Sequence, residues 1–183
     1  LYGGAGSDSL RGGSGSDLLD GGTGSDALRG EAGNDVLSMA VTTGTARPGH
    51  DVLDGGGHDA GTAGDVVSFN AQPADFGVQA DLATGAADAS LSGTEGLVGT
   101  DLDDRLFGDG ADNLLVGGTG DDLILGRDGN DALLGDAGDD TLMGGGAVIA
   151  MGCTIGQGLS AFSVLAFSAP MTMAAIFAGA ALG

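Results

Sequence analysis

Aliphatic side chains recur at every ninth residue along two long stretches of the chain. They are Leu10, Leu19, Leu28 and Leu37 in the first stretch and Leu106, Leu115, Ile124, Leu133 and Leu142 in the second. The residues between them are mostly glycine and polar residues, so each period offers one large side chain for burial. One such side chain cannot stabilise a free-standing element, and the periods must therefore stack and share a core. The pattern predicts an all-β solenoid of short strands and tight turns.

Each period begins with a glycine-rich turn and has an aspartate at its sixth position, except that one period has Asn113 there. Residues 3–11 read GGAGSDSLR and residues 117–125 read GGTGDDLIL. Glycine at the first, second and fourth positions permits positive φ and a close approach of backbone carbonyl groups. We therefore expect six residues to form a turn with inward-facing oxygens and the other three to form a strand.

Two periods are expected to make one coil of a two-sheeted roll, so that turns 18 residues apart are stacked. This spacing pairs Asp8 with Asp26, Asp17 with Asp35, Asp104 with Asp122, Asp122 with Asp140, and Asn113 with Asp131. Stacked carboxylates repel by about 4 kcal/mol per pair at ~4 Å and an effective dielectric constant near 20. A bound cation would remove this repulsion.

Calcium is the cation that this donor set favours. It accepts roughly six to eight oxygen ligands, whereas magnesium demands a tighter octahedron and retains its water. Zinc would need His or Cys, which the repeats lack. The candidate metal ligands are Asp8, Asp17, Asp26, Asp35, Asp104, Asp122, Asp131 and Asp140, with the turn glycines Gly4, Gly6, Gly13, Gly15, Gly22, Gly24, Gly118, Gly120, Gly129 and Gly138.

These periods resemble the RTX, or haemolysin-type, calcium-binding nonapeptide GGxGxDxUx. The resemblance implies a parallel β-roll, several bound Ca²⁺ ions, export by type I secretion machinery and an extracellular or cell-surface location. The alternative is a flexible linker rich in Gly, Ser and Asp. A linker would not keep an aliphatic residue in register through nine periods.

The charge of the chain restricts its partners. Twenty-four Asp, two Glu, five Arg and no Lys give a formal net charge of −21. Nucleic acid and acidic membrane surfaces are therefore excluded as expected partners. The absence of Lys also argues against a phosphate-binding loop, and neither HExxH nor GxSxG occurs. We expect no enzymatic activity and no catalytic residue in this chain.

Two histidines each precede an aspartate in glycine-rich loops. His50 and His58 could each form a metal-binding or acid/base pair with that aspartate. A solvated loop histidine is the favoured interpretation, because the sequence shows no third partner for either residue.

The nine-residue period fails between the two stretches. We therefore expect a first repeat block at residues 1–38, an insert at residues 39–98 and a second block at residues 99–146. Within the insert, residues 49–54 keep the second half of a repeat, and Val78, Ala80 and Leu82 alternate with other residues before a Thr84-Gly85 turn. This alternation predicts short strands or a β-hairpin inserted into the roll.

Residues 147–183 contain no charged side chain and are rich in Ala, Leu, Phe, Met and Ile. A charge-free run of this length is a membrane candidate, and Pro170 would divide it into two short helices or kink a single one. We therefore expect an apolar helical tail and membrane association through it. The run also resembles the YeeE/YedE-type sulfur-transport membrane family, on the motif Gly152-Cys153-Thr154 followed by Gly156-Gln157-Gly158. That resemblance implies a functional thiol at Cys153, whereas a lone cysteine in an apolar run is more often a packing residue.

Two functional hypotheses follow. The first is a calcium-binding β-roll module of a larger secreted or surface bacterial protein, which folds on binding calcium outside the cell. The alternative is a fragment of a membrane transporter for a thiosulfate-like sulfur compound, fused to RTX repeats. The chain begins in mid-pattern at Leu1, with no initiator Met and no signal peptide, so we expect it to be a fragment.

Overall fold

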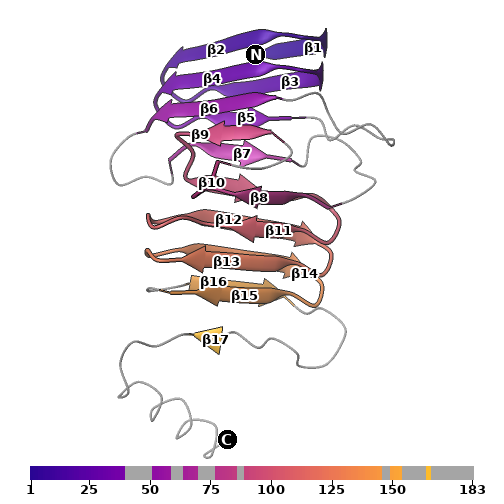
Figure 1. The fold of residues 1–183 in the computed structure, drawn as a ribbon, viewed down its shortest axis with the longest axis vertical. Helices are drawn as coiled ribbons and strands as arrows, with labels where there is room; N and C mark the ends of the chain where they lie inside the picture. Colours follow the sequence, from indigo (N-terminus) through magenta and orange to yellow (C-terminus); the bar gives the residue numbers. More distant parts are fainter. Residues whose placement is uncertain are drawn as a thin grey trace, which may run out of the picture.

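The computed structural model describes residues 1–39, 51–58, 64–69, 77–85, 89–145, 149–153 and 164–165. Every regular element in these ranges is a β-strand (Figure 1). The strands are β1 (Tyr2–Gly6), β2 (Ser9–Ser14), β3 (Leu18–Gly24), β4 (Ala27–Ala32), β5 (Val36–Ser38), β6 (Val52–Gly57), β7 (Val66–Ser68), β8 (Gln79–Asp81), β9 (Ser90–Ser92), β10 (Gly96–Val98), β11 (Arg105–Phe107), β12 (Leu114–Thr119), β13 (Leu123–Arg127), β14 (Ala132–Ala137), β15 (Thr141–Gly144), β16 (Ile149–Cys153) and β17 (Val164–Leu165).

The strands form two facing walls of parallel strands, and the chain alternates between the walls except from β8 to β9, which lie on the same wall. One wall is a continuous sheet in the order β1-β3-β5-β7-β10-β12-β14-β16. The opposite wall consists of a sheet β2-β4-β6-β9 and a sheet β8-β11-β13-β15-β17. The parallel β-roll expected from the nine-residue period is therefore present (Figure 1).

The register of the strands follows the expected 18-residue coil. Leu19 lies beside Leu37 on the first wall, and Leu106 lies beside Ile124 on the second. The aliphatic residues at the eighth position are buried between the walls, and in the interior of the roll Leu19, Leu37, Leu106 and Ile124 are all fully buried. Each coil therefore contributes two side chains to one shared core, which is how a sequence with so few large residues folds.

The insert, for which the sequence predicts short strands or a β-hairpin, contributes short strands that continue the roll. Its strands β7 and β10 pair in parallel with β5 and β12 on the first wall. Strands β8 and β9 pair in parallel with β11 and β6 on the second wall. Of the two alternatives, the described residues show the short strands, which bury Val67, Ala80, Leu91 and Leu97 in the common core.

The expected helical tail is not supported by the residues of 147–183 that the structure describes. Residues 149–153 form strand β16, which pairs in parallel with β14, and residues 164–165 form β17 beside β15. Thr154, Gly156, Gln157, Gly158 and Pro170 lie outside the described residues, as does His50. Within the described ranges, no helix has the length and apolar character needed to cross a membrane.

Candidate calcium-binding turns

The turn glycines have the backbone conformation that the repeat pattern predicts. Positive φ values are found at Gly4, Gly6, Gly13, Gly15, Gly22, Gly24, Gly118, Gly120, Gly129 and Gly138. At Gly24 and Gly138 the turns also approach most closely, because a Cβ there would overlap the carbonyl oxygen of Gly6 or Gly120 in the preceding coil. Carbonyl oxygens therefore face the space between stacked turns.

The sixth-position side chains form a hydrogen-bonded ladder along each edge of the roll. In each rung, Oδ1 of one aspartate accepts the backbone N–H of the residue stacked before it. The N–H to Oδ1 distances are 2.8 Å for Asp8 to Asp26, 2.8 Å for Asp17 to Asp35, 2.8 Å for Asp104 to Asp122, 3.1 Å for Asp122 to Asp140 and 3.0 Å for Asn113 to Asp131. These are the five pairs that the 18-residue spacing predicts.

The second carboxylate oxygen has no hydrogen-bond donor in most of the ladder aspartates, although Oδ2 of Asp104 accepts the backbone N–H of Thr100 at 2.6 Å. Buried Oδ2 atoms without a hydrogen-bond partner belong to Asp8, Asp17, Asp26, Asp35, Asp65, Asp122 and Asp131. In each repeat this oxygen packs against the first glycine of the turn, where a Cβ on Gly21 would lie 2.7 Å from Oδ2 of Asp26. A buried acceptor without a donor is costly. Together with the inward-facing carbonyls, these oxygens suit a cation that accepts only oxygen ligands.

Burial also perturbs the protonation of these groups. Loss of solvent, together with the nearby charges of Asp104 and Asp140, raises the pKa of Asp122 to about 7, although the hydrogen bond from the Asp104 N–H acts in the opposite direction. Burial likewise raises the pKa of Asp104, Asp131 and Asp140. In the absence of a metal ion, the ionised ladder is therefore destabilised by desolvation first and by mutual repulsion second.

Three ladder residues were missed by the sequence analysis. Asp51 accepts the N–H of Asp26 at 2.7 Å, Asp65 accepts the N–H of Asp35 at 2.7 Å, and Glu95 accepts the N–H of Asp65 at 2.9 Å. The insertions between them change the sequence spacing to 25 or 30 residues. A spacing-independent signal was present, because each acid precedes a buried aliphatic residue by two positions.

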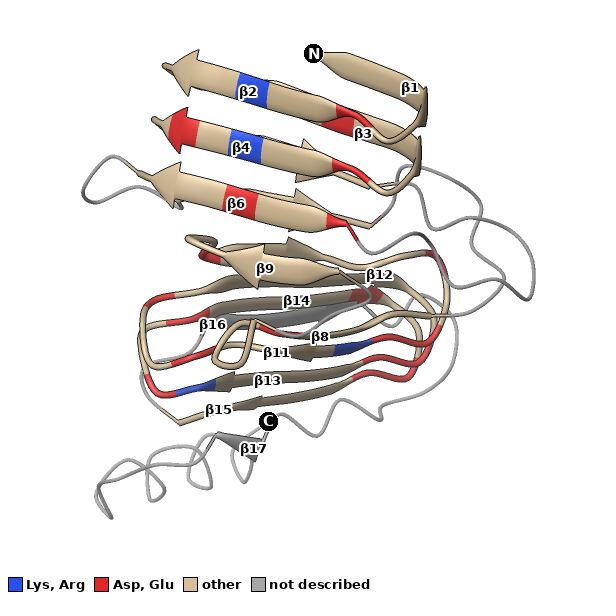
Figure 2. Ribbon diagram, turned by 45° about the horizontal axis from the view of Figure 1, so that its top comes forward, with Lys and Arg blue, Asp and Glu red and all other residues tan. Residues whose placement is uncertain are grey.

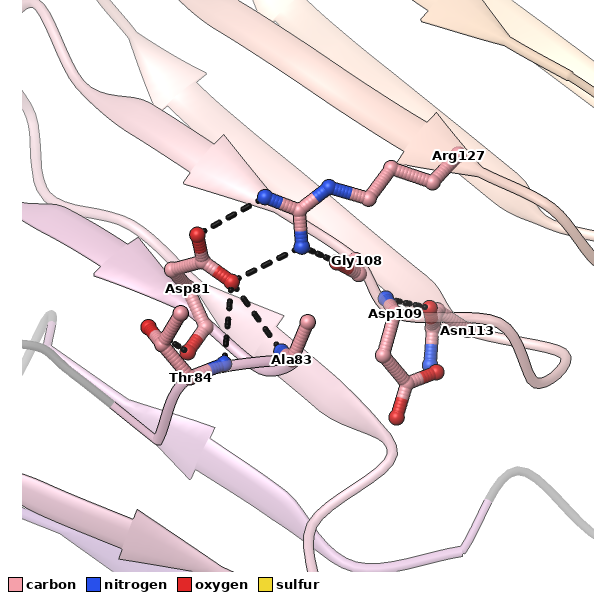
Figure 3. Close-up of polar contacts among 7 residues, drawn as sticks. All are labelled: Asp81, Ala83, Thr84, Gly108, Asp109, Asn113 and Arg127. Carbon is pink, nitrogen blue, oxygen red and sulfur yellow. Dashed lines mark hydrogen bonds and ion pairs between the residues drawn. The ribbon is translucent and has the colours of Figure 1, made fainter.

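Arg127, in the second block, forms an ion pair that is separate from the carboxylate ladder (Figure 3). Its guanidinium makes a two-pronged ion pair with Asp81, with nitrogen–oxygen distances of 2.8 and 2.7 Å, and also donates to the carbonyl of Gly108. It lies 5.7 Å from the ring centre of Phe107. The pKa of Asp81 is lowered mainly by its hydrogen bonds to Arg127. The guanidinium thus ties β8 to the end of β13 across β11.

The carboxylates are spread along the edges of the roll rather than gathered at one point (Figure 2). Within the described ranges, no group of three or more His, Cys, Asp or Glu side chains is placed to hold a metal ion by side chains alone. A cation between two turns would therefore draw on the aspartates above and below it and on backbone carbonyls. Such an all-oxygen set fits calcium and does not fit zinc.

Comparison with known families agrees with this geometry. Residues 2–37, 98–133 and 116–147 match the family described as RTX calcium-binding nonapeptide repeat (4 copies). These segments are RTX repeats. Calcium is accordingly the ion of the RTX turns, while the ligand role of each individual Asp and Gly stays a prediction.

Residues 133–182 match a second family, described as Sulphur transport. This match overlaps the last RTX repeat, begins within strand β14 and includes strands β15, β16 and β17. No curated protein matches the chain.

Proposed function

We propose that the chain is a non-enzymatic calcium-binding β-roll module of a larger secreted or surface protein, and that it folds on binding calcium outside the cell. The observation that carries the proposal is the row of buried Oδ2 atoms without donors at stacked RTX turns. A fold that buries a carboxylate oxygen without a donor in most of its coils is stabilised by a cation placed beside those oxygens.

The residues that would hold calcium are the stacked aspartates and the carbonyls of the intervening turns. Bound calcium supplies positive charge between carboxylates that otherwise repel. The protein's own contribution is orientation, because the Oδ1 hydrogen bonds hold each carboxylate with Oδ2 directed into the turn. Positive φ at glycines such as Gly118 and Gly120 lets the carbonyl oxygens approach the same space.

The proposed extracellular setting is supported by the calcium affinity typical of extracellular modules and by the net charge of the chain. Extracellular calcium modules bind with dissociation constants of ~10⁻⁴ to 10⁻³ M. At cytosolic calcium levels such sites are empty, and the repulsion within a chain of net charge −21 opposes folding. Folding would therefore follow export.

Circular dichroism of the full chain tests this function. Addition of millimolar calcium to calcium-free protein is expected to produce a β-type far-ultraviolet spectrum, and excess chelator is expected to remove it. Magnesium at the same concentration serves as the matched control and should be much less effective, because it resists dehydration by carbonyl ligands. A spectrum that is the same in chelator and in calcium would refute calcium-dependent folding.

A second candidate function is supported by the Sulphur transport match over residues 133–182. In this alternative, the chain is part of a membrane transporter for a sulfur compound, with Cys153 as its functional thiol. Cell fractionation separates the two functions, because release into the medium favours the roll and retention in the integral-membrane fraction favours transport. The pairing of β16, which contains Cys153, with β14 is the observation that favours the roll for this segment.

A further inference from the structure

The carboxylate ladder continues through the part of the chain that lies between the RTX matches. The N–H of Asp35 donates to Asp65 Oδ1 at 2.7 Å, and the N–H of Asp65 donates to Glu95 Oε2 at 2.9 Å. The next coil begins at Asn113, whose Nδ2 donates to the carbonyl of Glu95 at 3.3 Å. Residues 38–97 lie outside the RTX matches. We infer that Asp65 and Glu95 form a calcium site of their own that joins the two repeat blocks.

Asp65 provides the evidence that points to a ligand. Its side chain is 0% exposed, and its Oδ2 has no hydrogen-bond partner. The oxygen packs against Gly55, where a Cβ would lie 2.7 Å from it, as the repeat aspartates pack against the first glycine of their turns. A buried carboxylate oxygen without a donor is costly, and a positive charge beside it would offset that cost.

Glu95 provides the second carboxylate and an approach from solvent. Its Oε2 lies 3.2 Å from Nδ1 of His58, and its side chain is 20% exposed. Beside it is a cavity of about 140 Å³, whose lining includes Thr94 and, from the second block, Asp109. This cavity lies where the second wall is divided between β9 and β8. It leaves room for the water ligands that calcium needs when protein carboxylates are few.

The chemistry of the site favours calcium over a transition metal. His58 is the single imidazole at Glu95, and the described residues offer no third carboxylate, thiol or imidazole converging with this pair. The carbonyl oxygen of Gly93 lies against Gly55, as Oδ2 of Asp65 does, and adds an oxygen donor that suits a hard cation. Occupation of this site would make the two RTX blocks fold as one cooperative unit instead of two.

The inference rests on the proposed function, and equilibrium dialysis of the full chain with calcium tests it. Asp65→Asn keeps an oxygen for the N–H of Asp35 and removes the charge. It is expected to bind at least one calcium ion fewer than the unmodified chain, with a several-fold higher calcium midpoint for folding. Asp54→Asn is the matched control, because Asp54 lies on the neighbouring strand β6, outside the ladder, and accepts a hydrogen bond from Ser92. It should behave like the unmodified chain.

Asp122→Asn, in a matched RTX repeat, separates this inference from the proposed function. If Asp122→Asn loses calcium but Asp65→Asn does not, the joining site is refuted and the RTX function stands. If the unmodified chain binds no calcium, both are refuted. Zinc binding without calcium binding at Asp65 would also overturn the assignment. Should Asp65→Asn fail to fold in saturating calcium, Glu95→Gln at the partly exposed partner decides by the same comparison.

Discussion

At the scale of the residue, a ladder aspartate such as Asp122 uses its two carboxylate oxygens differently. Its Oδ1 accepts the backbone N–H of Asp104 in the preceding coil, and its Oδ2 is buried without a donor. The first contact fixes the direction of the carboxylate, so the second oxygen is already oriented when a cation arrives. This pre-organisation reduces the entropy that must be lost when the metal binds.

Asp122 is the residue whose removal should weaken calcium binding most clearly. It is stacked on Asp104 on one side and Asp140 on the other. Asp122→Ala is therefore expected to impair two neighbouring sites and to raise the calcium midpoint of folding about tenfold, equivalent to about 1.4 kcal/mol. Asp54→Ala should leave the midpoint within a factor of about two. Equal shifts for both variants in a calcium titration would show that the stacking has no functional meaning.

The buried ladder also predicts an unusual pH dependence of the calcium-free protein. An aspartate titrates near about 3.9 in the unfolded chain, whereas burial raises the pKa of Asp122 to about 7 in the folded roll. The folded state therefore binds more protons than the unfolded state between these values, and its stability increases as the pH falls from about 7 towards about 4. In calcium-free buffer, the β-type circular dichroism signal should therefore be larger at pH 5 than at pH 7.5. A smaller signal at pH 5 would contradict the assigned burial.

At the scale of the element, each turn depends on backbone geometry that only some residues tolerate. Gly138 has φ of 152°, and a Cβ there would overlap the carbonyl oxygen of Gly120. Gly110 lies in open space and lacks a positive φ. Substitution of these two glycines therefore distinguishes a steric requirement for glycine in the turn from a general effect of replacing glycine.

Gly138→Ala is expected to destabilise the calcium-saturated roll by about 1–3 kcal/mol, because it adds both strain and a steric overlap. Gly110→Ala is the matched control and should change the free energy of unfolding by less than about 0.5 kcal/mol. Chemical unfolding monitored by circular dichroism measures both values. Similar losses for the two variants would mean that the close approach of stacked turns does not limit stability.

The contacts of Arg127 with Asp81 and Gly108 give a second prediction at the scale of the element. Arg127→Lys keeps the positive charge but cannot reproduce the two-pronged contact with Asp81 together with the hydrogen bond to Gly108. We expect a loss of about 1 kcal/mol in the free energy of unfolding, a modest value because the pair is partly exposed. Arg29→Lys, at an exposed position on β4, is the control. An unchanged unfolding midpoint for Arg127→Lys would show that the contacts of the guanidinium do not stabilise the roll.

At the scale of the whole molecule, the sequence predicted the repeat blocks better than what lies between and after them. The eighth-position leucines and the 18-residue pairs were predictable, because a nine-residue period leaves one stacking register that buries every large side chain. Asp65 and Glu95 were missed, because insertions of variable length hide the register in the sequence while β7 and β10 keep it in space. The contact of Arg127 with Asp81 joins two residues that are 46 positions apart in the sequence, and no local sequence pattern predicts it.

The last part of the chain shows the limit of composition as a guide. Residues 147–183 lack charge and suggested an apolar helix, yet residues 149–153 pair with β14 as another strand of the first wall. Backbone pairing at the edge of an existing sheet satisfies hydrogen-bonding groups irrespective of side-chain charge. Composition therefore gave the wrong element at the position where an open sheet edge was available.

Deletion of residues 147–183 tests the role of this segment in the whole molecule. The deletion removes no ladder residue, so calcium-induced folding should persist. Loss of the strand paired with β14 should lower the unfolding midpoint slightly, and removal of the apolar residues should improve solubility. Circular dichroism and light scattering measure the two effects. Complete loss of the calcium response would show that the segment caps the roll and is required for folding.

The central claim is that stacked RTX turns hold calcium through the ladder oxygens that lack a hydrogen-bond donor. The anomalous scattering of calcium, in crystals of the protein grown with the ion, tests this claim most directly. We predict peaks between successive turns, within roughly 2.3–2.6 Å of Oδ2 atoms such as those of Asp26, Asp35, Asp122 and Asp131. Peaks confined to exposed aspartates, with water or no density beside these buried oxygens, would contradict the account.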